Sequence, residues 1–345
     1  MSSRKAKALR ASEIQKKIEA TKLSETPPPA EVPNFEALSF PYAPYTGLVG
    51  IHTSLLAFTA LYLPRSSLHI PTALYNAYYQ ISDPYDSTVL SQPKSDISGT
   101  SIIASLTTSP VQTLAWTVVG VAVLQAWWGG WVKQWALRAR EDGSEGERKA
   151  QRRELEKDKD LNQAFLATGT TSVLFFATLI LFGAPLTSHL AHTYLLSLLL
   201  SFLAVFPPAY TLGVPISFTW PSTSFLSLPQ LDSSQSSFLL RLYWVRLFAE
   251  LSPRTPLERA LVYPAVGTAL GCWLGAIPLA LDWDRSWQAW PLPPTYGALL
   301  GYVSGSLGAM IVSAIQYFAD MNRMNAQARQ ERKVKETNSK KKKNN

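Results

Sequence analysis

One short polar segment of this sequence collects the residue types that could do chemistry. Residues 282–295 carry two carboxylates and one guanidinium, on Asp282, Asp284 and Arg285. The carboxylates could bind a metal ion or act as acid and base, and the guanidinium could hold a phosphate through paired hydrogen bonds. The other candidates in this segment for contact with a partner or a lipid are Trp283, Trp287, Gln288 and Trp290.

A catalytic metal site in this segment would need further metal ligands. The sequence contains no HExxH motif or paired-histidine spacing of a metal site, and its single cysteine, Cys272, lies inside an apolar run. We therefore expect no catalytic residue, no metal and no cofactor in this chain. Two interpretations stay open: a structural turn in which Asp284 pairs with Arg285, and contact with a partner protein or a lipid phosphate.

Two uncharged apolar runs flank the segment and must position it. Ala260–Leu281 has 22 residues and Tyr296–Phe318 has 23, and each is long enough to cross the roughly 30 Å hydrocarbon core of a bilayer. The polar segment is therefore the tip of a membrane hairpin. Its tryptophans are typical of the membrane–water interface.

Glycines recur every four residues in both runs, which places each set on one face of a helix. Such faces let a second helix approach closely, so that van der Waals contact stabilises the pair inside lipid. Two interpretations stay open: docking of a partner's helix, and packing of spans within this chain. The glycines are Gly267, Gly271 and Gly275 in the first run and Gly297, Gly301 and Gly305 in the second.

The composition agrees with an all-α polytopic membrane protein. The chain is 47% hydrophobic and only 16% charged, below the roughly 25% charge of a soluble domain. We expect a basic, Pro-rich arm over residues 1–43, a membrane domain over 44–320 and a basic tail over 321–345. The six expected spans cover residues 45–63, 111–131, 162–182, 190–213, 260–281 and 296–318.

Two charged stretches do not suit a span. The run over residues 132–161 predicts a solvated linker or a short exposed helix. Phe238–Phe248 is too short and too charged to cross, and we expect it to lie in the interface with Arg241 and Arg246 toward water. His52 falls inside the first span, where a polar side chain generally faces protein rather than lipid.

The distribution of basic residues predicts the orientation. Of the 32 Lys and Arg residues, all but Arg65, Lys94 and Arg285 lie on the side of the two termini. Cytosolic segments carry such an excess, so both termini are expected in the cytosol and the hairpin tip in the lumen. The net charge of +8 is explained by this asymmetry, and no nucleic-acid module is recognisable.

The C-terminal residues resemble a known retrieval signal. Lys342 and Lys343 stand fourth and third from the end, as in the dilysine retrieval signal of endoplasmic reticulum membrane proteins. An ordinary basic tail is the alternative.

The hairpin also carries a family resemblance. Its pattern is similar to that of the phosphatidylinositol-glycan class F family, although the family usually has proline where this chain has Ala280 and Ser286. The matching residues are Gly271, Trp273, Gly275, Ala276, Pro278, Leu281, Asp282, Trp283, Asp284, Arg285, Trp287, Gln288, Trp290, Pro291, Gly297, Ala298, Gly301 and Tyr302.

The resemblance implies a function. Members of the family are membrane subunits in the assembly of glycosylphosphatidylinositol (GPI) anchors in the endoplasmic reticulum. The resemblance implies that this chain is a non-catalytic subunit that binds and stabilises the ethanolamine-phosphate transferases acting on GPI mannoses. Its expected partners are those transferases, and GPI intermediates are a further candidate.

Two other functions are alternatives. A lipid-modifying transferase would use Asp282, Asp284 and Arg285, and would turn over substrate without a partner. A glycolipid flippase would require ionisable residues deep in several spans, whereas only His52 is clearly deep.

Overall fold

The computed structural model describes residues 40–65, 106–107, 109–140, 146–185, 189–214, 235–281, 283 and 285–343. Two of the candidate site residues, Asp282 and Asp284, lie outside these ranges. The backbone of Lys342 and Lys343 is described as helical, but their side chains are not.

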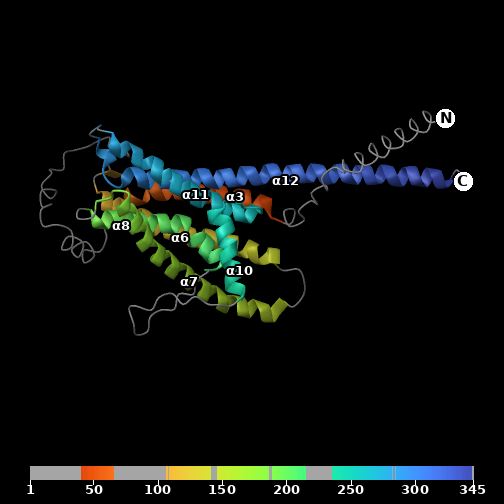
Figure 1. The fold of residues 1–345 in the computed structure, drawn as a ribbon, viewed down its shortest axis with the longest axis horizontal. Coiled ribbons are helices and arrows are strands. Elements are labelled where there is room, and N and C mark those ends of the chain that lie inside the picture. The colour runs from red at the N-terminus through yellow and green to blue at the C-terminus, as the bar shows by residue number, and fades with distance from the viewer. Residues whose placement is uncertain are drawn as a thin grey trace, which may run out of the picture. The chain divides into compact units, whose positions relative to one another are not determined.

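Helices make up the ordered elements of the described residues, with no strand among them (Figure 1). Six helical segments in these ranges are long and apolar enough to cross a membrane, which confirms the expected fold class. They are α3 (Tyr42–Leu61), α6 (Pro110–Arg140), α7 (Gly146–Leu181), α8 (Leu190–Ala204) continued by α9 (Phe206–Leu212), α11 (Pro256–Ala276) and α12 (Leu292–Lys343).

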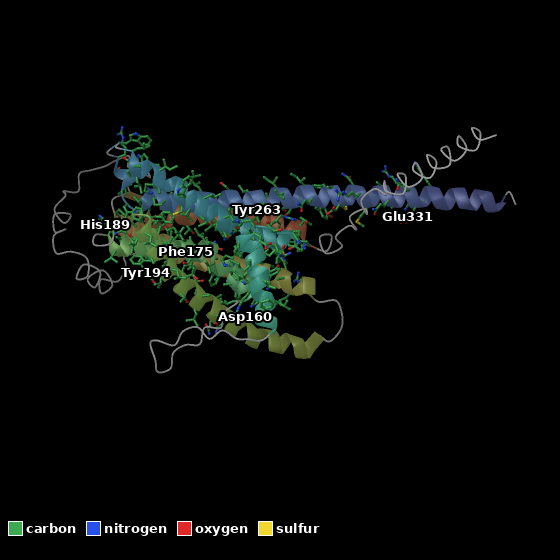
Figure 2. All side chains as sticks on the ribbon, viewed as in Figure 1. Asp160, Phe175, His189, Tyr194, Tyr263 and Glu331 are labelled. Carbon is green, nitrogen blue, oxygen red and sulfur yellow. The ribbon has the colours of Figure 1, made fainter. Side chains whose placement is uncertain are left out.

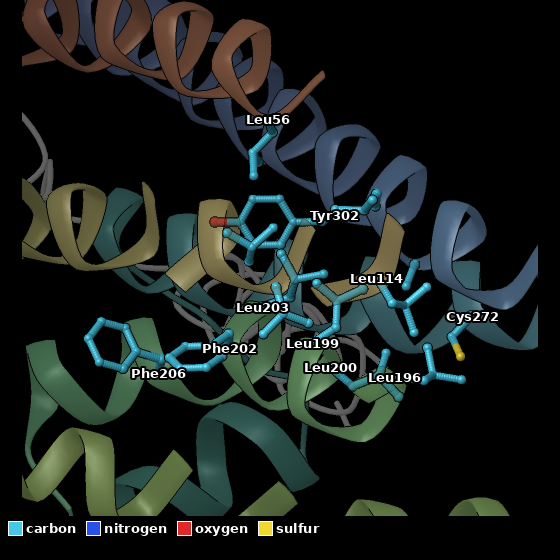
Figure 3. Packing of buried hydrophobic residues seen from close by; sticks show 14 of the residues in the cluster. Leu56, Leu114, Leu196, Leu199, Leu200, Phe202, Leu203, Phe206, Cys272 and Tyr302 are labelled. Carbon is cyan, nitrogen blue, oxygen red and sulfur yellow. The ribbon is translucent and has the colours of Figure 1, made fainter. Parts of the chain in front are cut away.

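The fourth span, α8 with α9, is the most buried. In its most apolar window 72% of the residues are buried, against 39% or less in the other five. Leu196 and Leu203 of α8 belong to a core cluster that also contains Tyr302 of α12 (Figure 3). The helix is interrupted before Phe206, because Pro207 and Pro208 have no N–H groups to continue the hydrogen bonding of α8.

A buried carboxylate fixes the start of α11. Glu258 is 4% exposed and forms a capping box with Thr255. It also accepts a hydrogen bond from the Tyr243 hydroxyl at 2.8 Å and pairs with Arg246 at 2.5 Å. A buried charge is stable only when it is paired, and this pair joins α11 to the segment that precedes it.

That segment corrects one expectation. Residues 235–249 do form a short helical element, α10 (Gln235–Trp244) followed by the π-turn η3 (Val245–Ala249). Arg246 was expected to face water, but its guanidinium pairs with the buried Glu258.

The charge run is helical where it is described. α7 begins at Gly146 and continues through the third span without a break, so much of the expected linker belongs to this helix. Near the start of the apolar part, Asp160 accepts a hydrogen bond from the buried Lys133 of α6. The Lys133 ammonium also lies 4.5 Å from the centre of the Tyr210 ring of α9. This cluster joins three spans.

α12 continues well beyond the predicted sixth span, as far as Lys343. Residues 40–315 of the described ranges belong to one compact unit, whereas the described residues 316–343 belong to a second unit. In the second unit, Arg323 of α12 pairs with Asp320 at 3.6 Å. The predicted boundaries of arm, membrane domain and tail stay predictions.

The two glycine sets lie against each other. A Cβ atom added to Gly271 would lie 2.1 Å from the carbonyl oxygen of Gly297, and one added to Gly267 would lie 2.2 Å from that of Gly301. A Cβ on Gly305 would similarly meet the Tyr263 carbonyl at 2.3 Å. The backbones of α11 and α12 are therefore in direct contact, which agrees with the interpretation of packing within the chain. The glycine face of each helix is covered by the other helix.

We predict that Gly271→Ala destabilises the chain, because the methyl group would meet backbone that cannot move aside. Overpacking of this kind costs about 1–3 kcal/mol. Cys272 is the only cysteine and is buried, so a thiol-reactive fluorophore reports unfolding in detergent as the temperature rises.

Gly47→Ala in α3 is the matched control, because nothing lies within 4 Å of an added Cβ there. It should unfold at the wild-type temperature or slightly above. Equal midpoints for the two variants would contradict the proposed role of the glycine contact.

Candidate functional site at the tip of the α11–α12 hairpin

The structure brings the described tip residues together between the ends of α11 and α12. After α11 the chain forms a short 3₁₀ turn, η4 (Ile277–Ala280), and then a second one, η5 (Ser286–Gln288). Trp283 and Arg285 lie between these turns and are exposed. Trp290 follows η5 and is partly buried.

Gln288 closes the tip. Its side-chain Nε2 donates hydrogen bonds to the carbonyl oxygens of Pro278 and Leu281, both at 2.7 Å. Its Oε1 accepts a hydrogen bond from the backbone N–H of Arg285 at 3.0 Å. Gln288 was predicted as a contact residue, but its amide is engaged inside the tip and holds η4 against η5.

The tryptophans divide into two roles. Trp283 is 53% exposed, and its ring centre lies 5.9 Å from that of Trp287. Trp290 instead turns inward, where its Nε1 donates a hydrogen bond to the Thr193 hydroxyl at 3.0 Å. The first two suit an interface with lipid headgroups, whereas Trp290 ties the tip to α8.

A second tie reaches α3. The hydroxyl of Tyr296, in the first turns of α12, donates a hydrogen bond to the carbonyl oxygen of Ala60 at 3.1 Å. Neither Thr193 nor Ala60 was predicted as a contact of the tip. Their partners stand 97 and 236 residues away in the chain, and neither has a local motif that could have indicated the contact.

A shallow, open pocket of about 530 Å³ lies beside Arg285. Of its described lining residues, Arg285 is the one that carries a charge. Ala280 and Ser286, where the family pattern usually has proline, both line it. The full lining is Leu279, Ala280, Leu281, Arg285, Ser286, Gln288 and Ala289.

The histidines form no metal cluster in the described part of the chain. His189 and His192 lie at the start of α8, with ring centres 4.9 Å apart. Figure 2 labels His189. Among the described residues, no group of three His, Cys, Asp or Glu side chains could hold a metal ion.

His52 faces protein, as expected for a polar side chain in a span. It is 1% exposed and stacks on Trp128 of α6 with ring centres 5.0 Å apart. The Tyr302 ring meets the His52 ring edge-on, with ring centres 5.7 Å apart. The Tyr302 hydroxyl donates a hydrogen bond to Gln125 Oε1 at 3.2 Å. His52 is therefore part of the packing between α3, α6 and α12.

Residues 96–310 match the model of the GPI biosynthesis protein family Pig-F. The chain belongs to this family. The match covers more than half of the 345 residues and includes the hairpin with its tip. The family assignment made from the hairpin pattern is confirmed.

Three relatives show the level of similarity within the family. Glycosylphosphatidylinositol anchor biosynthesis protein 11 of Pyricularia oryzae is 34% identical over 143 residues, which cover 41% of this chain and 43% of the relative. The protein of the same name from Yarrowia lipolytica is 37% identical over 155 residues, 44% and 56% of the two chains.

The human relative is named "GPI ethanolamine phosphate transferase, stabilizing subunit". It is 31% identical over 131 residues, 38% of this chain and 48% of the relative. These alignments span about half the length of the curated relatives. No solved structure matches the chain.

We predict that Gln288→Ala loosens the tip, because three hydrogen bonds between η4, η5 and the intervening chain are lost together. One of these bonds is made by the Arg285 amide itself. At roughly 1 kcal/mol of net stabilisation for that one hydrogen bond, the Arg285 amide should exchange its hydrogen on the order of tenfold faster. Hydrogen-exchange mass spectrometry of peptides covering residues 279–289 measures this.

Ser286→Ala is the control, since it shortens a neighbouring exposed side chain and leaves the Gln288 amide in place. Unchanged exchange in Gln288→Ala would show that other contacts hold the tip.

Proposed function

We propose that this chain is a non-catalytic subunit that binds and stabilises ethanolamine-phosphate transferases acting on GPI mannoses in the endoplasmic reticulum lumen. The observation that carries the proposal is the Pig-F family match across residues 96–310. The human and mouse relatives named as stabilizing subunits support it. The catalytic site belongs to the transferases, and GPI intermediates are a further candidate partner.

The packing of the hairpin supports a structural rather than a chemical role for its described residues. The amide of Gln288 and the indole N–H of Trp290 are engaged in hydrogen bonds within the chain. The glycine faces of α11 and α12 cover each other, so a transferase helix docks on another surface. Loss of the α11–α12 contact then affects the partner only by removing the folded subunit.

We predict that a transferase co-purifies with the tagged chain from mild detergent and is identified by mass spectrometry. Gly271→Ala should lower the amount of this chain and, with it, the amount of transferase, because the subunit no longer packs. Gly47→Ala should leave both amounts unchanged. Asp282→Asn should leave ethanolamine-phosphate transfer by the complex within several-fold of the wild type.

The alternative of a lipid-modifying transferase gives the reverse result. The purified chain alone would then transfer the group, and Asp282→Asn would abolish the activity of a complex that still assembles. Such an outcome would overturn the subunit proposal.

The orientation is part of the same proposal. The distribution of Lys and Arg supports cytosolic termini and a lumenal hairpin tip. Lys342 and Lys343 stay candidates for a signal that returns the protein to the endoplasmic reticulum.

The orientation predicts which inserted sites are glycosylated. The sequence has no Asn-x-Ser/Thr acceptor of its own, so any modification in microsomes reports an inserted acceptor. One placed after Ser91, between the first two spans, should be modified, and one placed after Gly143 should not. The opposite pattern would place the tip in the cytosol.

A further inference from the structure

We propose that the pocket at the hairpin tip binds the phosphate group of a membrane lipid through Arg285. This inference rests on the proposed function, in that it adds a lipid ligand to the membrane subunit. The pocket, the side chain that could hold a phosphate and the apolar rim around them are all described in the structure.

The pocket has a fixed frame. One wall is the end of η4 with Leu281, and the other is Arg285 with η5. Gln288 joins the two walls through its hydrogen bonds to Pro278, Leu281 and Arg285. A site whose walls are already joined loses less conformational entropy when a ligand binds.

Arg285 supplies the chemistry. Gln288 bonds only to its backbone: the Arg285 N–H donates to Gln288 Oε1, and the Arg285 carbonyl oxygen accepts from the Gln288 N–H. The Arg285 side chain is in no ion pair among the residues that the structure describes. A guanidinium presents five N–H donors in a planar fork, which matches two oxygens of a phosphate. Ser286 adds a hydroxyl to the same lining. The lining thus favours an anion with several oxygen acceptors.

Exposed apolar residues in the lining or within two residues of it in the chain, here called the rim, indicate that the anion is carried by a lipid. Leu281 belongs to the lining and is 41% exposed. Trp283 and Ile277, which are near lining residues in the chain, are 53% and 47% exposed. Exposed tryptophans typically lie at the depth of the lipid headgroups, and the neighbouring aliphatic side chains would meet the acyl chains. A lipid phosphate lies at this depth, whereas a free phosphate ion would gain nothing from the apolar rim.

Two sources share this chemistry. The phosphate could belong to a simple anionic lipid such as phosphatidic acid, or to a phosphoethanolamine headgroup, which pairs it with an ammonium. An ammonium could lie against the ring of Trp283, which is 53% exposed and lies beside the ring of Trp287, through cation–π attraction. Comparing the two lipids separates the sources.

The experiment uses the full chain, purified in detergent and titrated with lipid, with bound lipid counted by native mass spectrometry. Phosphatidic acid, phosphatidylethanolamine and phosphate-free diacylglycerol are the three ligands. Arg285→Gln should weaken binding of the phosphate lipids about tenfold, as expected for the loss of charge-assisted hydrogen bonds. Arg285→Lys should recover part of that loss, and diacylglycerol binding should not change.

Arg65→Gln is the matched control. Arg65 follows α3 in the short turn η1 (Leu63–Arg65) and is exposed. The Tyr296–Ala60 hydrogen bond places the end of α3 beside the start of α12, so the control removes an arginine from the same end of the bundle. It should leave binding unchanged.

The outcomes are separable. Equal losses in Arg285→Gln and Arg65→Gln, or no loss in either, would overturn the proposal. Arg285-dependent binding of phosphatidylethanolamine alone would assign the headgroup, and binding of both lipids would assign the phosphate itself. Co-purification of a transferase with Arg285→Gln is scored in parallel, so failure of the lipid site and failure of the subunit proposal give different results.

Discussion

The contact between the glycine faces of α11 and α12 determines the rest of the hairpin. Lipid chains are as apolar as leucine, so two membrane helices associate through close packing rather than through the hydrophobic effect. Here the approach is so close that a single added carbon at Gly267, Gly271 or Gly301 would overlap a backbone carbonyl. This contact sets how closely the two helices approach each other, and thereby the distance that the tip has to bridge.

Polar side chains then connect the hairpin to the other spans. Trp290 reaches α8, Tyr296 reaches α3 and Tyr302 reaches Gln125 of α6. Within the hairpin itself, Arg259 near the start of α11 donates a hydrogen bond to Ser313 of α12 at 2.9 Å. A hydrogen-bonding group that faced lipid would have no partner, so each of these contacts both satisfies a polar group and fixes a helix position.

The sequence predicted the architecture because its signals are local. Run length and low charge predicted six spans, and a spacing of four predicted the glycine faces of α11 and α12. The choice between packing within the chain and docking of a partner needed the structure, because a glycine face has the same pattern in both cases. At the tip, too, the sequence pattern does not distinguish the roles of the tryptophans. Trp283 is exposed, whereas Trp290 donates a hydrogen bond to Thr193, 97 residues away in the chain.

The tip thus contains two kinds of polar residue, and the difference bears on function. Gln288 and Trp290 are engaged in the fold, so substituting either would disturb structure and any function together. Arg285 is exposed, and among the described residues its side chain is in no ion pair. An exposed guanidinium presents N–H donors and no acceptor, so it can bind an anion through charge-assisted hydrogen bonds. Arg285 is therefore suited to binding an anion rather than to taking up a proton.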